Sequence, residues 1–196
     1  MIRIYYCRSE PLAITDEISE YRRQKIVSAK RGADKRMMIS AAKVLKSGFA
    51  DLGIAEKDVI YAFGDQGKPF AENCPSIHFS LAHSDKMSIC AFSDKKIGID
   101  CEISQRDIPT EIISRYFKKQ ELEEFSEDPL LLWVTKEAFV KYTGKGMALG
   151  RNELTLPYFE GKLMLSGVYF KRLDICGYTA VICAEAPDSV EIKEVP

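Results

Sequence analysis

Two acidic side chains close a strand-like segment near the middle of the chain. Residues 97–102 read Ile-Gly-Ile-Asp-Cys-Glu, a β-branched run that ends in Asp100 and Glu102. Side chains alternate between the two faces of a strand, so residues two apart share a face. The spacing therefore predicts that both carboxylates point to the same side, with Cys101 directed away from them.

A helical segment further along the chain carries complementary groups. Within residues 133–141, Trp133, Glu137 and Lys141 recur at four-residue spacing, which places them on one side of a helix. If this helix packs on the acidic strand, three carboxylates converge with a lysine beside them. Carboxylate oxygens are the hard ligands that Mg²⁺ uses when it holds a substrate's phosphates. Together the two segments indicate a magnesium site that binds phosphate groups.

Each of these features has an ordinary structural role when it is taken alone. Two carboxylates after a strand are more often solvated than metal-bound, and Trp133 is more often a core residue that orients its helix. Glu137 and Lys141 could form a common surface ion pair at i, i+4 spacing. His78 alternates with apolar residues and is expected to face solvent without a role.

The composition is that of an ordinary globular protein. The 196 residues are 46% hydrophobic and 29% charged, with a net charge of −1, which argues against a general nucleic-acid binder or a membrane-surface protein. No apolar stretch approaches the length of a membrane span, and the first residues lack signal-peptide architecture. We therefore expect a cytoplasmic protein that binds neither nucleic acid nor membrane.

The cysteines form no CxxC pair and no regular framework, and several lie within apolar strand-like runs. This pattern predicts reduced cysteines that act as small buried hydrophobes. A zinc site is not expected, and no feature favours a thiol nucleophile. The six are Cys7, Cys74, Cys90, Cys101, Cys176 and Cys183.

Helical and strand patterns alternate along the chain and suggest two similar halves. Each half has helices followed by an antiparallel sheet, which predicts an α+β fold divided into residues 1–97 and 98–196. A polar turn at 93–96 suggests a hairpin between its flanking strands. Strands are expected at 1–7, 59–63, 77–82, 87–92 and 97–102, and within 153–195. Helices are expected at 13–29 and 33–52, and within 109–142.

A weak internal repeat supports the two halves. Residues in the two strand regions match at a spacing of 93, although four matches between alternating strands can arise by chance. The acidic pair is not repeated, because Lys193 and Val195 stand where Asp100 and Glu102 would recur. Only one of two related interfaces would then carry a metal. The matching pairs are Ile89 and Ile182, Cys90 and Cys183, Ala91 and Ala184, and Ile99 and Ile192.

Five motifs together carry a family resemblance. They are Gly-Lys-Pro at 67–69, Phe-Ser-Leu-Ala-His-Ser at 79–84, G-[IV]-D-x-E at 98–102, W-x-x-K-E-[AS]-x-x-K at 133–141 and Gly-Lys-Gly at 144–146. In this order and spacing the chain resembles the 4′-phosphopantetheinyl transferases of the Sfp type. The resemblance implies transfer of the 4′-phosphopantetheine arm of coenzyme A to a serine of an apo acyl or peptidyl carrier protein, a holo-[acyl-carrier-protein] synthase activity that releases adenosine 3′,5′-bisphosphate.

The resemblance also implies an architecture and a set of partners. The family fold is a pseudo-twofold α+β monomer with its active site between the halves. Coenzyme A is the substrate and Mg²⁺ the cofactor, and the carriers serve fatty-acid, polyketide or nonribosomal-peptide synthesis. The N-terminal half would bind the nucleotide and phosphates of coenzyme A, and the C-terminal half would hold the metal site and the catalytic helix.

Site residues follow from the motif positions. By resemblance, Asp100, Glu102 and Glu137 hold Mg²⁺, Glu137 is also the candidate base for the serine proton, and Lys141 contacts the pyrophosphate. Further contacts to coenzyme A fall, again by resemblance, on Arg36 near the 3′-phosphate, Lys68 at the nucleotide end and His83 at a phosphate. A neighbouring basic cluster, not aligned one to one with the family, is Arg22, Arg23 and Lys25. Basic residues that could dock an acidic carrier, or could equally form a solvated helix face, are Arg115, Lys118 and Lys119.

The chain departs from the family pattern at one position of the site. Ala82 stands where the family has a serine before the histidine, so a hydroxyl contact must come from Ser80 or Ser84 or be missing. The chain is also shorter than typical members. Neither departure removes a group that the chemistry requires.

Two other classes of function remain open from sequence. A non-catalytic coenzyme A or carrier-protein binding module could share the fold, although loss of a metal ligand would be its signature and all three acids are present. In a structural or interaction protein the converging acids would be incidental. Five motifs in family order make this last class the weaker of the two.

Overall fold

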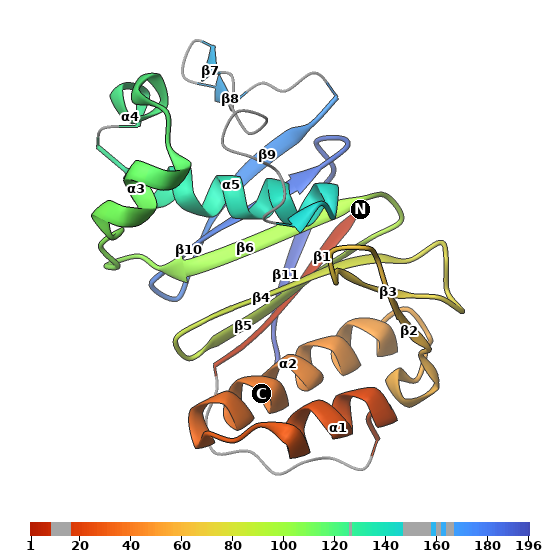
Figure 1. The fold of residues 1–196 in the computed structure, drawn as a ribbon. Helices are drawn as coiled ribbons and strands as arrows, with labels where there is room; N and C mark the ends of the chain where they lie inside the picture. Colours follow the sequence, from red (N-terminus) through yellow and green to blue (C-terminus); the bar gives the residue numbers. More distant parts are fainter. Residues whose placement is uncertain (9–16, 126, 147–157, 160–161, 164–166) are drawn as a thin grey trace.

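The chain folds into two larger sheets with helices packed against them, and the described residues also form two small two-stranded sheets. The computed structural model describes residues 1–8, 17–125, 127–146, 158–159, 162–163 and 167–196 (Figure 1). In Figure 1 two helices lie below one sheet, and a long helix of the C-terminal half lies across the strands of the other. This arrangement confirms the predicted α+β class.

Helices and strands of the N-terminal half come first along the chain. They are β1 (Ile2–Arg8), α1 (Glu20–Ser28), α2 (Gly32–Ala50), the 3₁₀ helix Glu56–Asp58, β2 (Tyr61–Phe63), β3 (Pro69–Ala71), β4 (His78–Ser84) and β5 (Met87–Ser93). The C-terminal half follows with β6 (Ile97–Ile103), α3 (Thr110–Tyr116), α4 (Lys119–Glu124), α5 (Pro129–Thr143), β7 (Tyr158–Phe159), β8 (Lys162–Leu163), β9 (Tyr169–Ile175), β10 (Tyr178–Ala184) and β11 (Val190–Glu194).

The strand order joins the two ends of the chain. One sheet has the order β11-β1-β5-β4 and the other β6-β10-β9, while β2 pairs with β3 and β7 with β8. The pairing of β1 with β11 is parallel, and the other pairings among the described strands are antiparallel. The last strand therefore crosses back to complete the N-terminal sheet.

The two halves repeat the same strand pairing. Tyr5 of β1 faces Cys90 of β5, and Gly98 of β6 faces Cys183 of β10, so both partners are displaced by 93 residues. The same displacement holds at each position that the two pairings share. The spacing noticed in the sequence thus corresponds to a structural repeat.

The hairpin predicted across residues 93–96 was wrong. The turn exists, but β5 and β6 belong to different sheets, because β5 already has β1 and β4 on its two edges and β6 pairs with β10. A side-chain contact links the sheets instead, since the Ser80 hydroxyl of β4 accepts a hydrogen bond from the backbone N–H of Ile99 at 3.1 Å. Parts of the predicted segments 13–29 and 153–195 lie outside the described residues.

Apolar side chains of the described residues form four clusters. One lies between strands of the two larger sheets, an aromatic one lies beneath α2, a third lies beneath α5, and a small fourth one includes residues of α1 and α2. All six cysteines are free, as predicted, and Cys7, Cys90, Cys101 and Cys183 are buried, whereas Cys74 is half-buried and Cys176 is exposed. Among the helices described, none has the length and apolar character to cross a membrane.

Candidate active site

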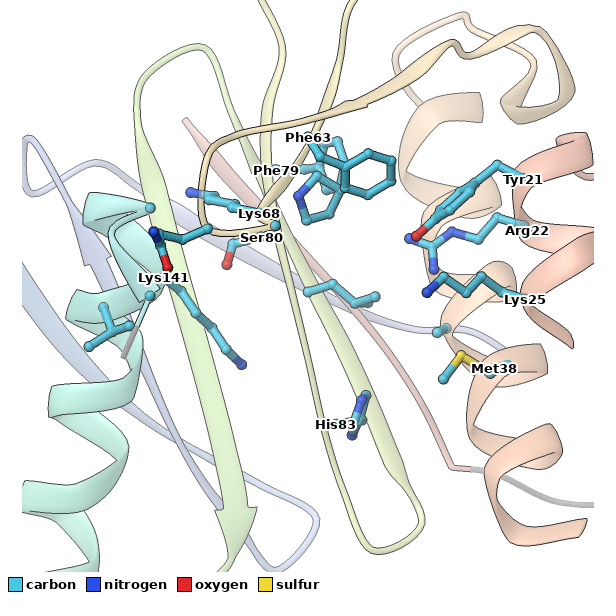
Figure 2. Close-up of a pocket in the computed structure, with 18 residues that line it drawn as sticks. Tyr21, Arg22, Lys25, Met38, Phe63, Lys68, Phe79, Ser80, His83 and Lys141 are labelled. Atoms are coloured by element: carbon cyan, nitrogen blue, oxygen red, sulfur yellow. The ribbon is translucent and has the colours of Figure 1, made fainter. Parts of the chain in front are cut away.

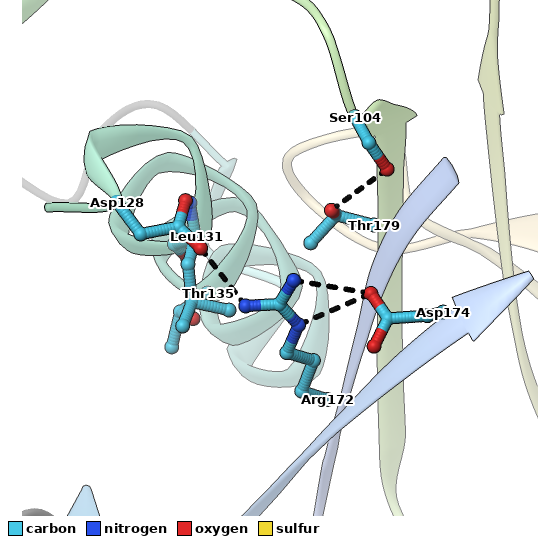
Figure 3. Close-up of polar contacts among 7 residues, drawn as sticks. All are labelled: Ser104, Asp128, Leu131, Thr135, Arg172, Asp174 and Thr179. Atoms are coloured by element: carbon cyan, nitrogen blue, oxygen red, sulfur yellow. Dashed lines mark hydrogen bonds and ion pairs between the residues drawn. The ribbon is translucent and has the colours of Figure 1, made fainter. Parts of the chain in front are cut away.

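Helix α5 has well-defined ends that set its position. Asp128 caps its N-terminus, accepting a hydrogen bond from the N–H of Leu131 at 2.8 Å, and Gly144 ends it in the left-handed conformation with φ of 72°. Figure 3 shows Arg172 of β9 bridging Asp128 and Asp174, with its guanidinium 2.8 Å from an Asp128 carboxylate oxygen. The start of the helix is therefore tied to the edge strand of its own sheet.

Gly98 permits close packing of α5 on β6. A β-carbon at this position would lie 2.1 Å from the carbonyl oxygen of Ala138 and 2.4 Å from the backbone nitrogen of Tyr142. Both atoms belong to the helix backbone, so any side chain at position 98 would displace the helix. Asp100 and Glu102 follow Gly98 at two-residue steps and therefore share its helix-facing side.

The acids of β6 are buried and already paired with cations. Asp100 and Glu102 are only 7% and 9% exposed. An Asp100 oxygen accepts a hydrogen bond from Nζ of Lys141 at 2.7 Å. Glu102 accepts one hydrogen bond from the Ser84 hydroxyl through Oε2 and forms an ion pair with Arg106 through Oε1.

Glu137 lies one helical turn before Lys141 on α5, and its charge interacts with those of Asp100 and Lys141. Burial raises the pKa of Glu137, and the negative charge of Asp100 acts in the same direction. Burial also raises the pKa of Asp100, while the charge of Lys141 opposes that effect. Burial alone would lower the pKa of Lys141, but its interactions with Asp100 raise it. The structure thus brings together Asp100, Glu102, Glu137 and Lys141, the set that the motif spacing predicted to converge.

The cluster has the donor chemistry for a hard divalent cation, although its side chains are turned toward protein cations. Three carboxylates supply the hard oxygen ligands that Mg²⁺ prefers. Within the part of the chain that the structure describes, no group of three or more His, Cys, Asp or Glu side chains is arranged to hold a metal ion. Two of the carboxylates face Lys141 and Arg106, so metal binding would require those contacts to change.

A cavity of about 330 Å³ opens beside this cluster. In Figure 2, Arg22 and Lys25 point into it from α1, and Lys141 faces them from α5 across the space. Lys68, in the connection just before β3, and His83 of β4 also line it. Basic side chains from four separate segments therefore surround one cavity, which suits a ligand with several phosphate groups.

Two members of the basic cluster on α1 line the cavity, whereas Arg36 lies outside its lining. Arg36 is exposed on α2 and does not line the cavity, whereas Arg22 and Lys25 do. Arg22 is only 5% exposed, and its Nε has no hydrogen-bond partner among the described residues. Its guanidinium lies 5.4 Å and 5.2 Å from the ring centres of Tyr21 and Tyr61. A buried cation with an unsatisfied donor at a cavity wall favours an anionic ligand.

Lys68 and His83 have altered basicity because of where they lie. The ammonium of Lys68 donates to the carbonyl of Ile97 at 2.8 Å. Burial lowers the pKa of Lys68 to about 8, and the charge of Lys96 acts in the same direction. Burial, together with the charge of Lys141, lowers the pKa of His83. Both side chains thus lie where a negative charge would restore the protonated form.

Ser80 and Ser84 are the two hydroxyls that could replace the family serine for which this chain has Ala82, and both have defined contacts. The Ser84 hydroxyl donates to Glu102, while Ser80 lines the cavity and accepts from the backbone of Ile99. Both serines lie beside the site, each with a different partner.

Sequence reasoning missed an aromatic wall of the cavity. Phe63 of β2 is 46% exposed, and its ring centre lies 5.2 Å from that of Tyr21 on α1. Both residues line the cavity. The sequence signal for this wall was an aromatic residue two positions after Tyr61, shortly before the Gly-Lys-Pro motif. Its importance depends on α1 lying opposite, which no local pattern shows.

Comparison with known proteins places the chain in a family. Residues 96–166 match the 4′-phosphopantetheinyl transferase superfamily. The chain is 31% identical over 152 residues to the 4′-phosphopantetheinyl transferase Sfp of Bacillus subtilis (strain 168), which covers 69% of this chain and 67% of that protein. It is 34% identical over 110 residues to the 4′-phosphopantetheinyl transferase gsp of Aneurinibacillus migulanus, covering 52% and 45% of the two chains. The chain belongs to the 4′-phosphopantetheinyl transferase superfamily, a family of transferases.

A third relative extends the comparison. The match to the 4′-phosphopantetheinyl transferase ffp of Bacillus subtilis is 29% identical over 150 residues and covers 68% of this chain and 66% of that protein. Across these relatives, the matched segments span between 45% and 67% of the relative's own length.

Proposed function

We propose that this protein transfers the 4′-phosphopantetheine group of coenzyme A to a serine of an apo acyl or peptidyl carrier protein. One observation carries the proposal. The carboxylate cluster of β6 and α5 shares Lys141 with a cavity that is lined by basic side chains. A site for phosphate displacement and a site for a polyphosphate ligand are thereby continuous. Family membership supports the same activity, because the family and the relatives that match the chain are named as 4′-phosphopantetheinyl transferases.

The reaction breaks the pyrophosphate linkage of coenzyme A and forms a phosphate ester on the serine. The serine oxygen attacks the β-phosphorus of coenzyme A, a new O–P bond forms, and the bond to adenosine 3′,5′-bisphosphate breaks. The developing negative charge lies on phosphate oxygens, so positioning and electrostatic stabilisation are the main tasks of the protein. Lys141 is suited to this work, since its ammonium lies at the junction of the cluster and the cavity.

Glu137 is the proposed base for the serine proton. Its pKa is raised by burial and by the nearby charge of Asp100, which makes the carboxylate a better proton acceptor than an exposed one. Asp100, Glu102 and Glu137 would also hold Mg²⁺, as the family resemblance implies. When bound, that ion would neutralise charge on the pyrophosphate.

The nucleotide end of coenzyme A is assigned to the α1 side of the cavity. Arg22, Lys25 and Lys68 are proposed to contact its phosphates, with His83 contacting a phosphate nearer the cluster. Phe63 supplies an exposed aromatic surface against which the flat adenine ring can pack. Arg36 stays a candidate for the 3′-phosphate on sequence grounds alone, because it lies outside the cavity lining.

Other features of the proposal rest on the family and on composition. An acidic carrier would dock against basic surface, for which Arg115, Lys118 and Lys119 on or beside α3 and α4 remain candidates. We also propose a cytoplasmic monomer. A non-catalytic binding module is the disfavoured alternative, since all three acids and the lysine are present and clustered.

Direct assay tests the proposal. The protein is incubated with coenzyme A, Mg²⁺ and a panel of apo carriers, and each carrier is weighed by mass spectrometry. Transfer adds one phosphopantetheine to the carrier and releases one adenosine 3′,5′-bisphosphate. A carrier whose acceptor serine is replaced by alanine is the matched control and should stay unmodified. Tight binding of coenzyme A with no product on any carrier would instead support the binding module.

A further inference from the structure

Arg106 makes an ion pair that the proposed reaction does not use. It follows β6 in the turn that leads toward α3, where its backbone N–H donates to the carbonyl of Ile103 at 3.0 Å. This turn brings the guanidinium back over the end of the strand, and one of its nitrogens pairs with Oε1 of Glu102. Among the described residues, Glu102 is the only acid that forms an ion pair with Arg106.

The ion pair with Arg106 and the hydrogen bond from Ser84 together engage both oxygens of Glu102. Oε1 contacts Arg106, and Oε2 accepts the hydrogen bond of the Ser84 hydroxyl. A divalent ion needs carboxylate lone pairs at short distance and in a demanding geometry. A guanidinium that donates to the same carboxylate competes for those lone pairs and repels the incoming positive charge.

The two protein cations of the cluster differ in how freely they can leave. Lys141 lines the cavity, and its side chain is 29% exposed. Arg106 is 40% exposed, does not line the cavity, and sits on a turn at the surface. Because the Arg106 guanidinium is solvent-accessible, it can return to water at low cost once another cation compensates Glu102.

We propose that Arg106 is an internal counter-cation for Glu102, which competes with the divalent metal and moves into solvent when the metal binds. The inference rests on the proposed function, because it assumes that Glu102 is a metal ligand. Without metal, the guanidinium compensates a buried carboxylate that would otherwise be costly to leave unpaired. With metal, the ion takes over that compensation. The apparent affinity of the site for metal is then the intrinsic affinity multiplied by the fraction of molecules in which Arg106 does not contact Glu102.

Two measurements on Arg106→Ala test this competition: its affinity for Mn²⁺ should rise, and its melting temperature without metal should fall. Mn²⁺ is titrated into the protein without coenzyme A, and free Mn²⁺ is followed by electron paramagnetic resonance. Loss of the competitor should tighten Mn²⁺ binding about two- to tenfold. The melting temperature without metal should fall by about 2–6 °C, because Glu102 loses its partner, and saturating Mn²⁺ should remove that difference.

Matched variants test whether the effect belongs to the guanidinium at position 106. Arg8→Ala removes an exposed arginine that pairs with Glu194, and it should leave Mn²⁺ affinity unchanged. Arg106→Lys keeps a charge without the guanidinium geometry and should give an intermediate affinity, which provides a measurement if the alanine variant fails to fold.

The outcomes distinguish this inference from the proposed function. Unchanged or weaker Mn²⁺ binding by Arg106→Ala, with the wild-type protein binding Mn²⁺ and modifying carriers, would overturn the role of Arg106 alone. A wild-type protein that binds no Mn²⁺ and modifies no carrier would overturn both the proposed function and the inference.

Discussion

The interface of α2 with its sheet and the interface of α5 with its sheet are related by the repeat but contain different side chains. Counting 93 residues forward from Val44 and Gly48 of α2 leads to Glu137 and Lys141 of α5. Val44 is fully buried, and Gly48 packs against the ring of Phe92. At the corresponding places α5 carries a carboxylate of raised pKa and a lysine that pairs with Asp100.

The strands beneath the helices differ in the same way. Tyr5 of β1 lies where the repeat places Gly98 in β6, and Tyr5 joins an aromatic core beneath α2 with Phe49 and Phe92. Gly98 has no side chain, so α5 approaches β6 closely. One interface is filled for stability, whereas the other brings desolvated charges into contact at the expense of stability. The comparison predicts that changes at α5 and β6 alter chemistry, and that changes in the N-terminal half alter folding or ligand binding.

The largest effect is expected at the acids of β6. Asp100→Ala and Glu102→Ala should each lower the transfer rate about 10²–10³-fold, and the double variant more than about 10⁴-fold, since each removes charge that would hold the metal and phosphates. Circular dichroism should show a preserved fold. Carrier modification followed by mass spectrometry measures the loss. Near-normal transfer in both single variants would remove these acids from the site.

Glu137→Gln separates the two roles of the helix carboxylate. If Glu137 is the base, kcat should fall about 10²–10⁴-fold while coenzyme A and Mg²⁺ still bind. If it is chiefly a ligand, high Mg²⁺ should recover much of the rate. Val44 occupies the repeat-related position in the other half, and Val44→Ala should lower the free energy of unfolding by about 1–3 kcal/mol and leave kcat unchanged. Full activity of Glu137→Gln at ordinary Mg²⁺ would exclude both roles.

The two interface glycines should respond differently to alanine. A methyl group at Gly98 meets backbone atoms of α5, which can yield only if the helix moves, so Gly98→Ala should lower kcat about tenfold or more as well as stability. A methyl group at Gly48 would lie 2.0 Å from the ring of Phe92, a side chain in the aromatic core. Gly48→Ala should therefore cost about 1–3 kcal/mol of stability without slowing the folded enzyme. Equal effects on kcat, measured well below both melting temperatures, would contradict the comparison.

Two exposed phenylalanines of the β2–β3 hairpin test the binding role of the N-terminal half. Phe63 and Phe70 are each 46% exposed, but only Phe63 lines the cavity beside α5. Phe63→Ala should weaken binding of adenosine 3′,5′-bisphosphate about 5- to 100-fold, because stacking on a base is lost. Phe70→Ala should leave it unchanged, and isothermal titration calorimetry gives both constants. Equal affinities in the two variants would place the base elsewhere.

The smallest effect concerns the pH dependence of nucleotide binding. Lys68 has a pKa of about 8 in the free protein, and a bound phosphate would raise it. Binding then takes up a proton above pH 8, so affinity for adenosine 3′,5′-bisphosphate should be steady below pH 8 and fall up to about tenfold by pH 9. Lys68→Arg stays charged throughout and should abolish this pH dependence. A wild-type affinity that does not change between pH 7 and pH 9 would show that Lys68 does not contact the phosphates.

Local periodicity predicted the half of the proposed site that holds the carboxylates and Lys141. Alternation along a strand placed Asp100 and Glu102 on one face, and four-residue spacing placed Glu137 and Lys141 on one side of a helix. Both patterns are properties of a single regular element, so they can be read without knowing what packs against it. The α+β class and the two similar halves followed from the order of such elements.

Only the tertiary structure decided which surfaces meet. The sheet order separates β5 from β6 although a short turn joins them, because long-range pairing with β1 and β10 competes with the local hairpin. It also places Arg22 rather than Arg36 at the cavity. These facts depend on contacts between residues that are distant in sequence, and local patterns along a single element carry no information about such contacts.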